Sequence, residues 1–250
     1  MTATTKDIPF QKTAALELAD KLLKERGALL QAGTGVGKTY ITAQALKQVI
    51  PTLLKSEAPD TPFPILWIGP AATMIQTQRV LKSYGIAQYV MTLSYSALTS
   101  PKTGGAMFYQ TRTEVTYGQE QIVYDWRECM LPRLVVFDEC QALKNEESTR
   151  TAIARGLPDS VKRLFISATP YQRVCEARTV MVGVGMRSEY NVLPLSQGTA
   201  PSVMRSLATY GNTSAYSPRA MEKVKGVMQP YTVNVKGIRF KHKARTECVL

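Results

Sequence analysis

One glycine-rich stretch of the sequence has the residue types and spacing needed to bind phosphate. Residues 32–39 read AGTGVGKT and fit the pattern G-x-x-x-x-G-K-[ST], except that Ala32 occupies its first position. Its glycines let the backbone curl so that successive N–H groups point at one anion, and a following helix adds the positive end of its dipole. Lys38 would reach the β- and γ-phosphates of a nucleotide, and the Thr39 hydroxyl would bind Mg²⁺. The expected phosphate-binding residues are Ala32, Gly33, Thr34, Gly35, Val36, Gly37, Lys38 and Thr39.

Two carboxylates form the second chemical element of the sequence. The run RLVVFDE, residues 133–139, predicts an apolar strand that delivers Asp138 and Glu139 at its C-terminal end. In an enzyme with a phosphate-binding loop, Asp138 would hold the Mg²⁺ shell, and Glu139 would orient and deprotonate the attacking water. A strand that simply leaves the core for solvent is the alternative. The glycine-rich loop about 100 residues earlier favours the catalytic interpretation.

The elements that must position these residues follow from the hydrophobic periodicity. Apolar runs alternate with helical patterns, which predicts a parallel sheet with helices on both faces and ligands at the C-terminal ends of its strands. Glycines at 27 and 85 are expected to end helices, and residues 51–64 to form an exposed connection. The predicted strands are 28–30, 65–68, 89–93, 133–139 and 162–166, and the predicted helices 12–26, 40–50, 73–83, 119–130 and 146–155.

Two regions give weaker patterns. Between 100 and 118 the periodicity fails, so a hairpin strand over 111–117 and an inserted loop both remain open. Beyond 171 we expect interrupted helical stretches over 172–186, helices over 202–210 and 218–228, and strands over 231–235 and 238–240. The expected domains are an ATP-binding domain over 1–180 and a mainly helical, basic extension over 181–250.

Composition narrows the class of protein. The 250 residues carry 31 Lys and Arg against 19 Asp and Glu, a net charge of +12, which favours a polyanionic partner such as nucleic acid over a generically basic protein. From Arg219 onward, eight Lys and Arg face only Glu222 and Glu247, and this basic segment is either a nucleic-acid surface or a solvated tail. Four scattered cysteines and one histidine argue against zinc and disulfide frameworks and favour a reducing, cytoplasmic or nuclear-type compartment. We expect no signal peptide and no membrane span.

Taken together, these segments resemble the first RecA-like lobe of superfamily-two helicases and translocases, in their DEAD/DEAH-like and SWI/SNF-type branches. The resemblance covers residues 5–175 and rests on six segments in family order. These are Gln11, AGTGVGKT, Gly69 to Thr73, Leu93 to Tyr95, Asp138 to Asn145 and Ser167 to Pro170.

The resemblance implies a role for each segment. Gln11 would pair with adenine, ATP and Mg²⁺ would be the cofactors, and Mg²⁺ would bind Thr39 and Asp138. The expected contacts to nucleic-acid phosphates are Pro70, Thr73, Ser94 and Tyr95, with DNA favoured over RNA. Gln141, where a DEAH-type box has histidine, would couple ATP hydrolysis to nucleic-acid binding together with Ser167 and Thr169.

The sequence departs from the family in lacking a second RecA-like lobe. Nothing after residue 180 offers another strand-helix series or a Q-x-x-G-R-x-x-R pattern, so we expect the chain to reach the boundary between lobes. A separate polypeptide or a longer chain would then supply the arginine finger, and the chain alone would hydrolyse ATP slowly.

Two other classes of protein remain open. One is a non-catalytic protein that binds nucleic acid or a partner and has a vestigial nucleotide site, which the intact Lys38, Thr39, Asp138 and Glu139 disfavour. The other is a different P-loop enzyme, such as a small-molecule kinase or an oligomeric ring ATPase. The paired acids at 138–139 and the Ser-Ala-Thr-Pro segment disfavour the kinase more than the ring.

Overall fold

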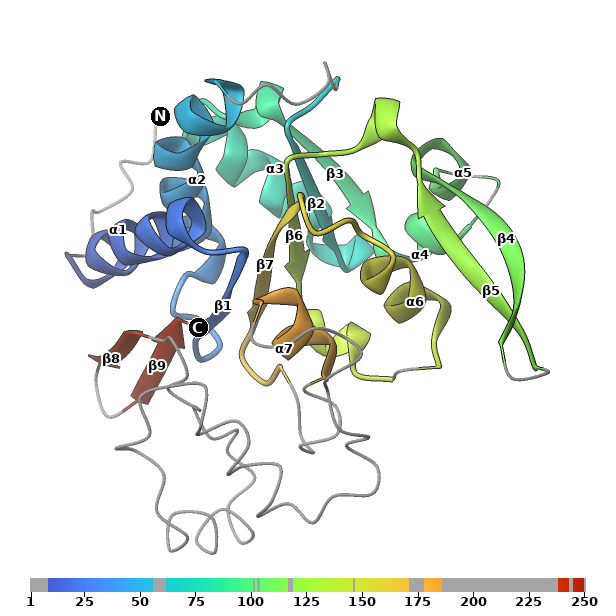
Figure 1. Ribbon diagram of the computed structural model, residues 1–250. Helices are drawn as coiled ribbons and strands as arrows, with labels where there is room; N and C mark the ends of the chain where they lie inside the picture. The colour runs from blue at the N-terminus through green and yellow to red at the C-terminus, as the bar shows by residue number, and fades with distance from the viewer. Residues whose placement is uncertain are drawn as a thin grey trace, which may run out of the picture.

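A computed structural model gives the fold. It describes residues 9–55, 62–100, 102, 104–116, 119–145, 147–170, 178–185, 238–242 and 245–249. Five parallel strands lie side by side in one sheet, in the order β3-β2-β6-β7-β1 (Figure 1). Their bounds are β1 Gly27–Gln31, β2 Ile65–Gly69, β3 Val90–Ser94, β6 Leu134–Asp138 and β7 Lys162–Ser167. The predicted parallel sheet and all five of its strands are confirmed.

Helices cover both faces of this sheet, as expected. The side chains of the strands alternate between two hydrophobic clusters, so that Leu29 and Phe137 enter one and Leu30 and Val136 enter the other. The second cluster is closed by helices α1, Pro9–Lys24, α2, Lys38–Lys55, and α3, Met74–Ser83. The first is closed by α4, Tyr95–Thr99, α6, Thr149–Arg155, and α7, Arg178–Gly183. The result is a three-layered α/β domain with a RecA-like order of strands.

The first two helices differ in detail from the sequence prediction. Helix α1 ends at Lys24, and Gly27 is the first residue of β1 rather than the cap of the helix. A Cβ on Gly27 would lie 2.6 Å from the Arg163 carbonyl oxygen and 2.7 Å from that of Gly183, so close packing explains this glycine. Pro51 lies inside α2 and does not begin the expected connection. The last turn of α2 persists past the proline because Leu53 is buried in the core.

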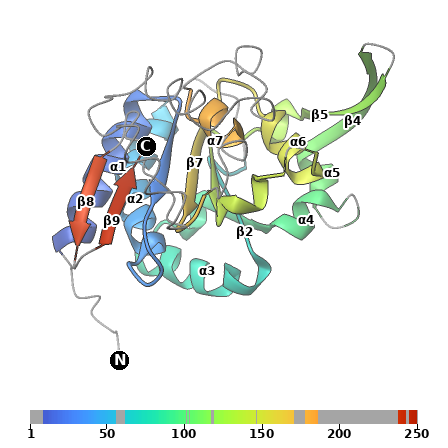
Figure 2. The same ribbon diagram turned by 90° about the horizontal axis from the view of Figure 1, so that it is seen from below.

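The segment after β3 contains the largest error of the sequence prediction. Residues 119–130 do not form a helix: β4, Tyr109–Thr116, and β5, Gln119–Trp126, pair antiparallel as a hairpin. This hairpin projects from the body of the domain (Figures 1 and 2). Tyr109 and Trp126 face each other at its buried base, where the Trp126 indole N–H donates to the Ile153 carbonyl oxygen at 2.9 Å. The β-branched and aromatic residues at 122–126 favour the strand that is observed. Between β3 and the hairpin lie α4 and the short helix α5, Gly105–Phe108.

Caps define the ends of two further helices. Gly85, with φ of +71°, follows α3 as predicted, and the N–H groups of Gly85 and Ile86 donate to the carbonyl oxygens of Lys82 and Leu81. The helix expected over 146–155 begins later, at Thr149, because the Ser148 hydroxyl accepts from the N–H of Thr151.

The C-terminal extension is described only in part. Strand β9, Arg245–Val249, runs antiparallel to β1, and β8, Ile238–His242, pairs with β9 at the edge of the sheet (Figure 2). Strand β8 contains the predicted strand over 238–240, and α7 lies in the predicted helical region over 172–186. The helices expected over 202–210 and 218–228 and the strand over 231–235 lie outside the described residues, so the predicted domain boundary at 180 stays a prediction.

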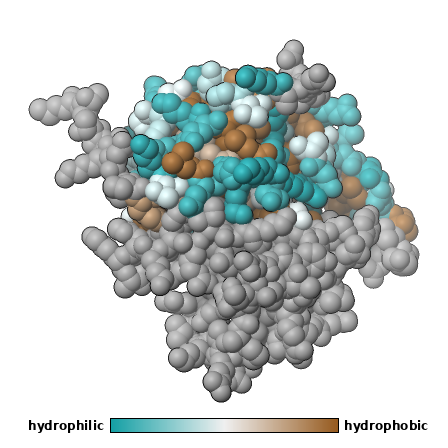
Figure 3. All heavy atoms as spheres, turned by 60° about the vertical axis from the view of Figure 1, so that its left-hand side comes forward, coloured by the Kyte–Doolittle hydropathy of each residue, from teal (hydrophilic) through white to brown (hydrophobic). Residues whose placement is uncertain are grey.

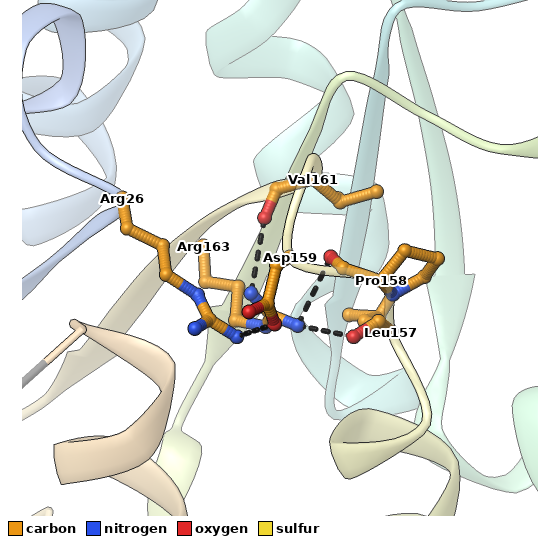
Figure 4. A network of polar contacts seen from close by, with 6 residues as sticks. All are labelled: Arg26, Leu157, Pro158, Asp159, Val161 and Arg163. Atoms are coloured by element: carbon orange, nitrogen blue, oxygen red, sulfur yellow. Dashed lines mark hydrogen bonds and ion pairs between the residues drawn. The ribbon is translucent and has the colours of Figure 1, made fainter. Parts of the chain in front are cut away.

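A polar network lies at the N-terminal ends of the adjacent strands β1 and β7. Arg163 is 3% exposed, and its guanidinium donates to the carbonyl oxygens of Leu157, Pro158 and Val161 (Figure 4). The guanidinium of Arg26 lies beside it and forms an ion pair with Asp159. Burial and the neighbouring Arg26 lower the pKa of Arg163 to about 10, so the side chain stays charged at neutral pH.

The surface of the described part is mixed in character. On the side that lies to the left in Figure 1, hydrophilic side chains surround scattered apolar ones (Figure 3). Leu16 and Leu23 of α1 and Leu54 of α2 are among the exposed apolar side chains of the domain. In the part of the chain that the structure describes, no helix combines the length and the apolar character that a membrane span requires.

Candidate functional site

The C-terminal ends of the five parallel strands bring most of the expected site residues to one edge of the sheet. In spatial order these ends carry Ser94, Gly69 with Pro70, Asp138, Ser167 and Gln31 with Ala32. The expected phosphate loop and the expected nucleic-acid contacts therefore occupy opposite ends of this edge, and Asp138 and Ser167 lie between them.

The glycine-rich loop connects β1 to α2. Gly35 and Gly37 have φ of +79° and +92°, a conformation that other residues rarely adopt, and Lys38 is the first residue of α2. The Lys38 ammonium donates to the Ala32 carbonyl oxygen at 3.3 Å, so it lies across the loop that it would share with a phosphate. This strand-loop-helix arrangement is the one that phosphate binding requires.

Gln11 of α1 contacts the same loop. Its amide Nε2 donates to the Val36 carbonyl oxygen at 2.8 Å. A Cβ on Gly37 would approach this nitrogen to 2.3 Å, so the contact depends on glycine at that position. The structure thus brings Gln11 to the loop, while its pairing with adenine stays a prediction.

The two acids follow directly at the end of β6. Asp138 is 6% exposed, and its Oδ1 accepts from the N–H of Glu139 at 3.1 Å. The pKa of Asp138 is raised to about 6, mainly by burial and secondly by the negative charge of Glu139. Glu139 has a φ of +51° and is the one non-glycine residue with positive φ among those described. Such a conformation costs free energy and recurs at functional sites.

A chain of hydrogen bonds leads from Glu139 to the end of β7. The Gln141 amide Nε2 donates to Glu139 Oε2 at 2.9 Å, and Gln141 Oε1 accepts from the Ser167 hydroxyl at 2.6 Å. The Ser167 oxygen in turn accepts from the N–H of Thr169 at 2.9 Å. All three residues expected to couple the two functions therefore connect to Glu139, although coupling itself stays a prediction.

The four expected nucleic-acid contacts lie at the ends of β2 and β3, but the hydroxyls of Thr73, Ser94 and Tyr95 form hydrogen bonds within the chain. The Thr73 hydroxyl donates to the Pro70 carbonyl oxygen at 3.0 Å, and Ser94 Oγ accepts from the N–H of Ala97 at 3.1 Å. Tyr95 is 5% exposed, and its hydroxyl donates to the Asp138 carbonyl oxygen at 3.0 Å. The Tyr95 side chain is thus part of the core and faces the acids rather than solvent.

The donor chemistry fits a nucleotide with Mg²⁺. Asp138 and Thr39 offer the oxygen ligands that this hard cation prefers. A divalent cation would also offset the raised pKa of Asp138, whose causes are burial and the charge of Glu139. In the described residues, no group of three His, Cys, Asp or Glu side chains forms a metal site by itself.

Comparison with known proteins decides the family. The family model of the DEAD/DEAH box helicase matches residues 9–177, more than half of the chain. The chain belongs to this helicase family. The expected resemblance to the first RecA-like, ATP-binding lobe of superfamily-two helicases is thereby confirmed. No curated protein sequence matches the chain.

One solved structure illustrates the extent of the similarity. The SWI2/SNF2 ATPase core of Sulfolobus solfataricus in complex with dsDNA aligns with 88% of this helicase chain at 16% identity and a TM-score of 0.48. The alignment covers 42% of that structure, so this chain spans less than half its length.

Sequence reasoning missed two contacts of Tyr95 in the helicase site. It assigned Tyr95 to nucleic acid and did not anticipate its bond to Asp138, 43 residues away. The guanidinium of Arg150, which lies 5.9 Å from the centre of the Tyr95 ring, was also missed. A Tyr after a strand end is compatible with many roles, so no local signal could have identified either contact.

Proposed function

We propose that this helicase lobe binds and hydrolyses ATP and couples this reaction to binding of nucleic acid. The observation that carries the proposal is the hydrogen-bonded path from Glu139 through Gln141 to Ser167, at an edge that also carries the phosphate loop. Loss of the γ-phosphate at the loop would be transmitted through these hydrogen bonds to the ends of the neighbouring strands, with the fold kept intact.

The residues of the loop and those at the end of β6 have different roles in the proposed reaction. The backbone N–H groups of residues 33–39 and the Lys38 ammonium bind the phosphates, and Lys38 exchanges its contact with Ala32 for them. Thr39 and Asp138 would hold Mg²⁺, and the bound cation would neutralise charge on the transferred phosphoryl group. Glu139 orients the attacking water and accepts its proton.

Nucleic acid is proposed to bind beside the ends of β2 and β3. The supporting observations are the net charge of +12 and the register that puts Gly69 beside Ser94, which brings Pro70, Thr73 and Ser94 together. Phosphate contacts of this kind position a strand without reading its sequence, so binding should weaken steeply with salt. DNA is the favoured partner, and RNA is an outcome of the test.

A second RecA-like lobe is proposed to complete the site. The sequence contains no Q-x-x-G-R-x-x-R pattern, and an arginine finger contributes roughly 10³–10⁵ in rate in related systems. The chain alone should therefore bind ATP and hydrolyse it slowly, and a lobe from another polypeptide or from a longer chain should accelerate it.

The test is ATP turnover with and without single-stranded DNA, double-stranded DNA and RNA. Lys38→Ala should abolish turnover, whereas Lys47→Ala, an exposed lysine of the same helix, should leave it unchanged. Equal turnover by wild type and Lys38→Ala would contradict the enzymatic proposal and would favour a non-catalytic nucleic-acid-binding protein.

A further inference from the structure

The peptide group between Asp138 and Glu139 is held from both sides. Its carbonyl oxygen accepts from the Tyr95 hydroxyl at 3.0 Å, and its N–H donates to Asp138 Oδ1 at 3.1 Å. Rotation of this peptide would change ψ of Asp138 and φ of Glu139 together. The two hydrogen bonds therefore oppose the rotation that would let Glu139 leave its conformation at φ +51° and ψ +55°.

Tyr95 is well suited to hold this peptide. Its ring is buried in the cluster that contains Phe137 and Cys140, and Arg150 lies over it. A tyrosine hydroxyl is protonated at neutral pH, so the group can donate to the Asp138 carbonyl oxygen. Tyr95 is the first residue of α4, whose N-terminus is capped by Ser94. The backbone of Tyr95 is thus fixed by the helix, and its hydroxyl by the bond to Asp138.

The Glu139 carboxylate has its own restraint. Gln141 donates to Glu139 Oε2, so Gln141 holds the tip of the side chain while Tyr95 holds the peptide from which the side chain departs. A general base gives its full effect only when its carboxylate is held within hydrogen-bond reach of the water. Either restraint alone leaves part of the side chain free to turn.

We propose that Tyr95 is a positioning residue for the reaction, whose hydroxyl fixes the Asp138–Glu139 peptide and so aims the Glu139 carboxylate. The role rests on the proposed function, because it concerns the base of the same ATPase. It differs from the role that the sequence predicts for Tyr95, since it requires no contact between its side chain and nucleic acid. Positioning residues act on the catalysed step more than on substrate binding.

Tyr95→Phe is the primary variant, because it removes the hydroxyl and keeps the buried ring. We expect kcat for ATP to fall about tenfold while KM stays within twofold of wild type. Tyr109→Phe is the matched control: Tyr109 is also buried, and its hydroxyl donates to the Leu98 carbonyl oxygen at 2.6 Å, outside the site. This control should leave kcat and KM within twofold. An equal loss of kcat in both variants would overturn the proposal in favour of a general effect on folding.

A Glu139→Gln background tests whether Tyr95 acts through Glu139. If it does, Tyr95→Phe should lower the turnover of wild type but not the residual turnover of Glu139→Gln. A tenfold loss in both backgrounds would mean that Tyr95 acts by another route, which would overturn the proposal.

A measurement without turnover separates this proposal from the proposed function. The ¹³Cα and ¹³Cβ chemical shifts of Glu139 in the nucleotide-free chain report its backbone conformation. We expect Tyr95→Phe to move them toward values for negative φ and Tyr109→Phe to leave them unchanged. Unchanged shifts in Tyr95→Phe would overturn the positioning role even if ATP is hydrolysed. Altered shifts in a chain that hydrolyses no ATP would support the role in the fold and contradict only the proposed function.

Discussion

The Ser167 hydroxyl donates to Gln141 Oε1 at 2.6 Å, and this bond joins the turn that follows β6 to the end of the adjacent strand β7. The same Gln141 side chain donates from its other end to Glu139. Only a neutral amide offers a donor and an acceptor in this fixed arrangement at every pH, whereas a histidine at this position would change charge near neutral pH. Gln141 itself therefore keeps the same charge in the link between Glu139 and Ser167 at every pH.

Gln141→Glu tests this link. The substitution preserves shape, removes the donor and puts a second negative charge beside Glu139, so we expect ATP turnover to fall by roughly tenfold or more. Nucleotide affinity should change little, because Gln141 does not belong to the phosphate loop. Steady-state turnover and equilibrium binding of ATP measure the two effects.

Gln121→Glu is the matched control for that variant. Gln121 is exposed on β5, so the same change of charge should leave turnover at the wild-type level. If Gln141→Glu also retained wild-type turnover, the amide link would have no part in catalysis.

The raised pKa of Asp138 predicts a pH-dependent cost to stability. The pKa is about 6 in the folded chain against an ordinary 3.8, so folding disfavours the ionised form. The contribution of Asp138 to the free energy of unfolding is therefore fully present below pH 3.8, where the carboxyl is protonated, and is lost as the pH rises through 6. Without Mg²⁺ and nucleotide, Asp138→Asn should therefore raise the free energy of unfolding by about 3 kcal/mol at pH 8.

Denaturant titrations of the metal-free chain between pH 4.5 and pH 8 check this value. The advantage of Asp138→Asn should shrink steadily as the pH is lowered through 6. Asp20→Asn, at an exposed position in α1, should show no such trend. If Asp138→Asn raised the free energy of unfolding by the same amount at pH 4.5 and at pH 8, ionisation of Asp138 would not be the cause of that increase.

Sequence reasoning predicted the parts of this helicase lobe whose signal is local. Three features were predicted from signals that lie within about ten residues: the loop at 32–39, the strand ending in Asp138 and the glycine at 85. Those signals are the backbone freedom of glycine and the hydrophobic periodicity of the strand. The order of these segments then determined the parallel sheet, because strand-helix-strand units connect in one hand.

The parts that were missed depend on contacts between distant residues. Residues 119–126 pair with β4 because Trp126 and Tyr109 share a buried base, and a helical pattern of apolar residues could not reveal that partner. Likewise, the hydrogen-bond partner of the Tyr95 hydroxyl is the carbonyl group of Asp138, 43 residues away. Gly27 was assigned to a helix cap because the approach of the Arg163 and Gly183 carbonyl groups leaves no mark in the sequence.

Two glycines should respond differently to alanine. At Gly27 a Cβ would lie 2.6 Å from a backbone oxygen of β7, and we expect Gly27→Ala to cost up to about 3 kcal/mol through overpacking. At Gly85 a Cβ would meet open space, so Gly85→Ala should cost only the left-handed strain, about 1 kcal/mol. Chemical denaturation of both variants measures the difference. The reverse order of the two losses would contradict the close approach at Gly27.

Buried carbonyl contacts should matter more than exposed ion pairs in this domain. Arg112 on the hairpin forms ion pairs with Glu114 and Asp125, but its side chain is half exposed. Arg163 donates to three carbonyl groups in the turn before β7 and is nearly inaccessible (Figure 4). Arg163→Met would remove the guanidinium donor from the carbonyl oxygens of the buried Leu157 and Val161, so we expect it to cost at least about 2 kcal/mol. Arg112→Met should leave the free energy of unfolding nearly unchanged, because solvent and salt screen exposed pairs. Thermal and denaturant unfolding of the two variants compare them directly, and equal losses would mean that Leu157, Pro158 and Val161 find other donors when Arg163 is removed.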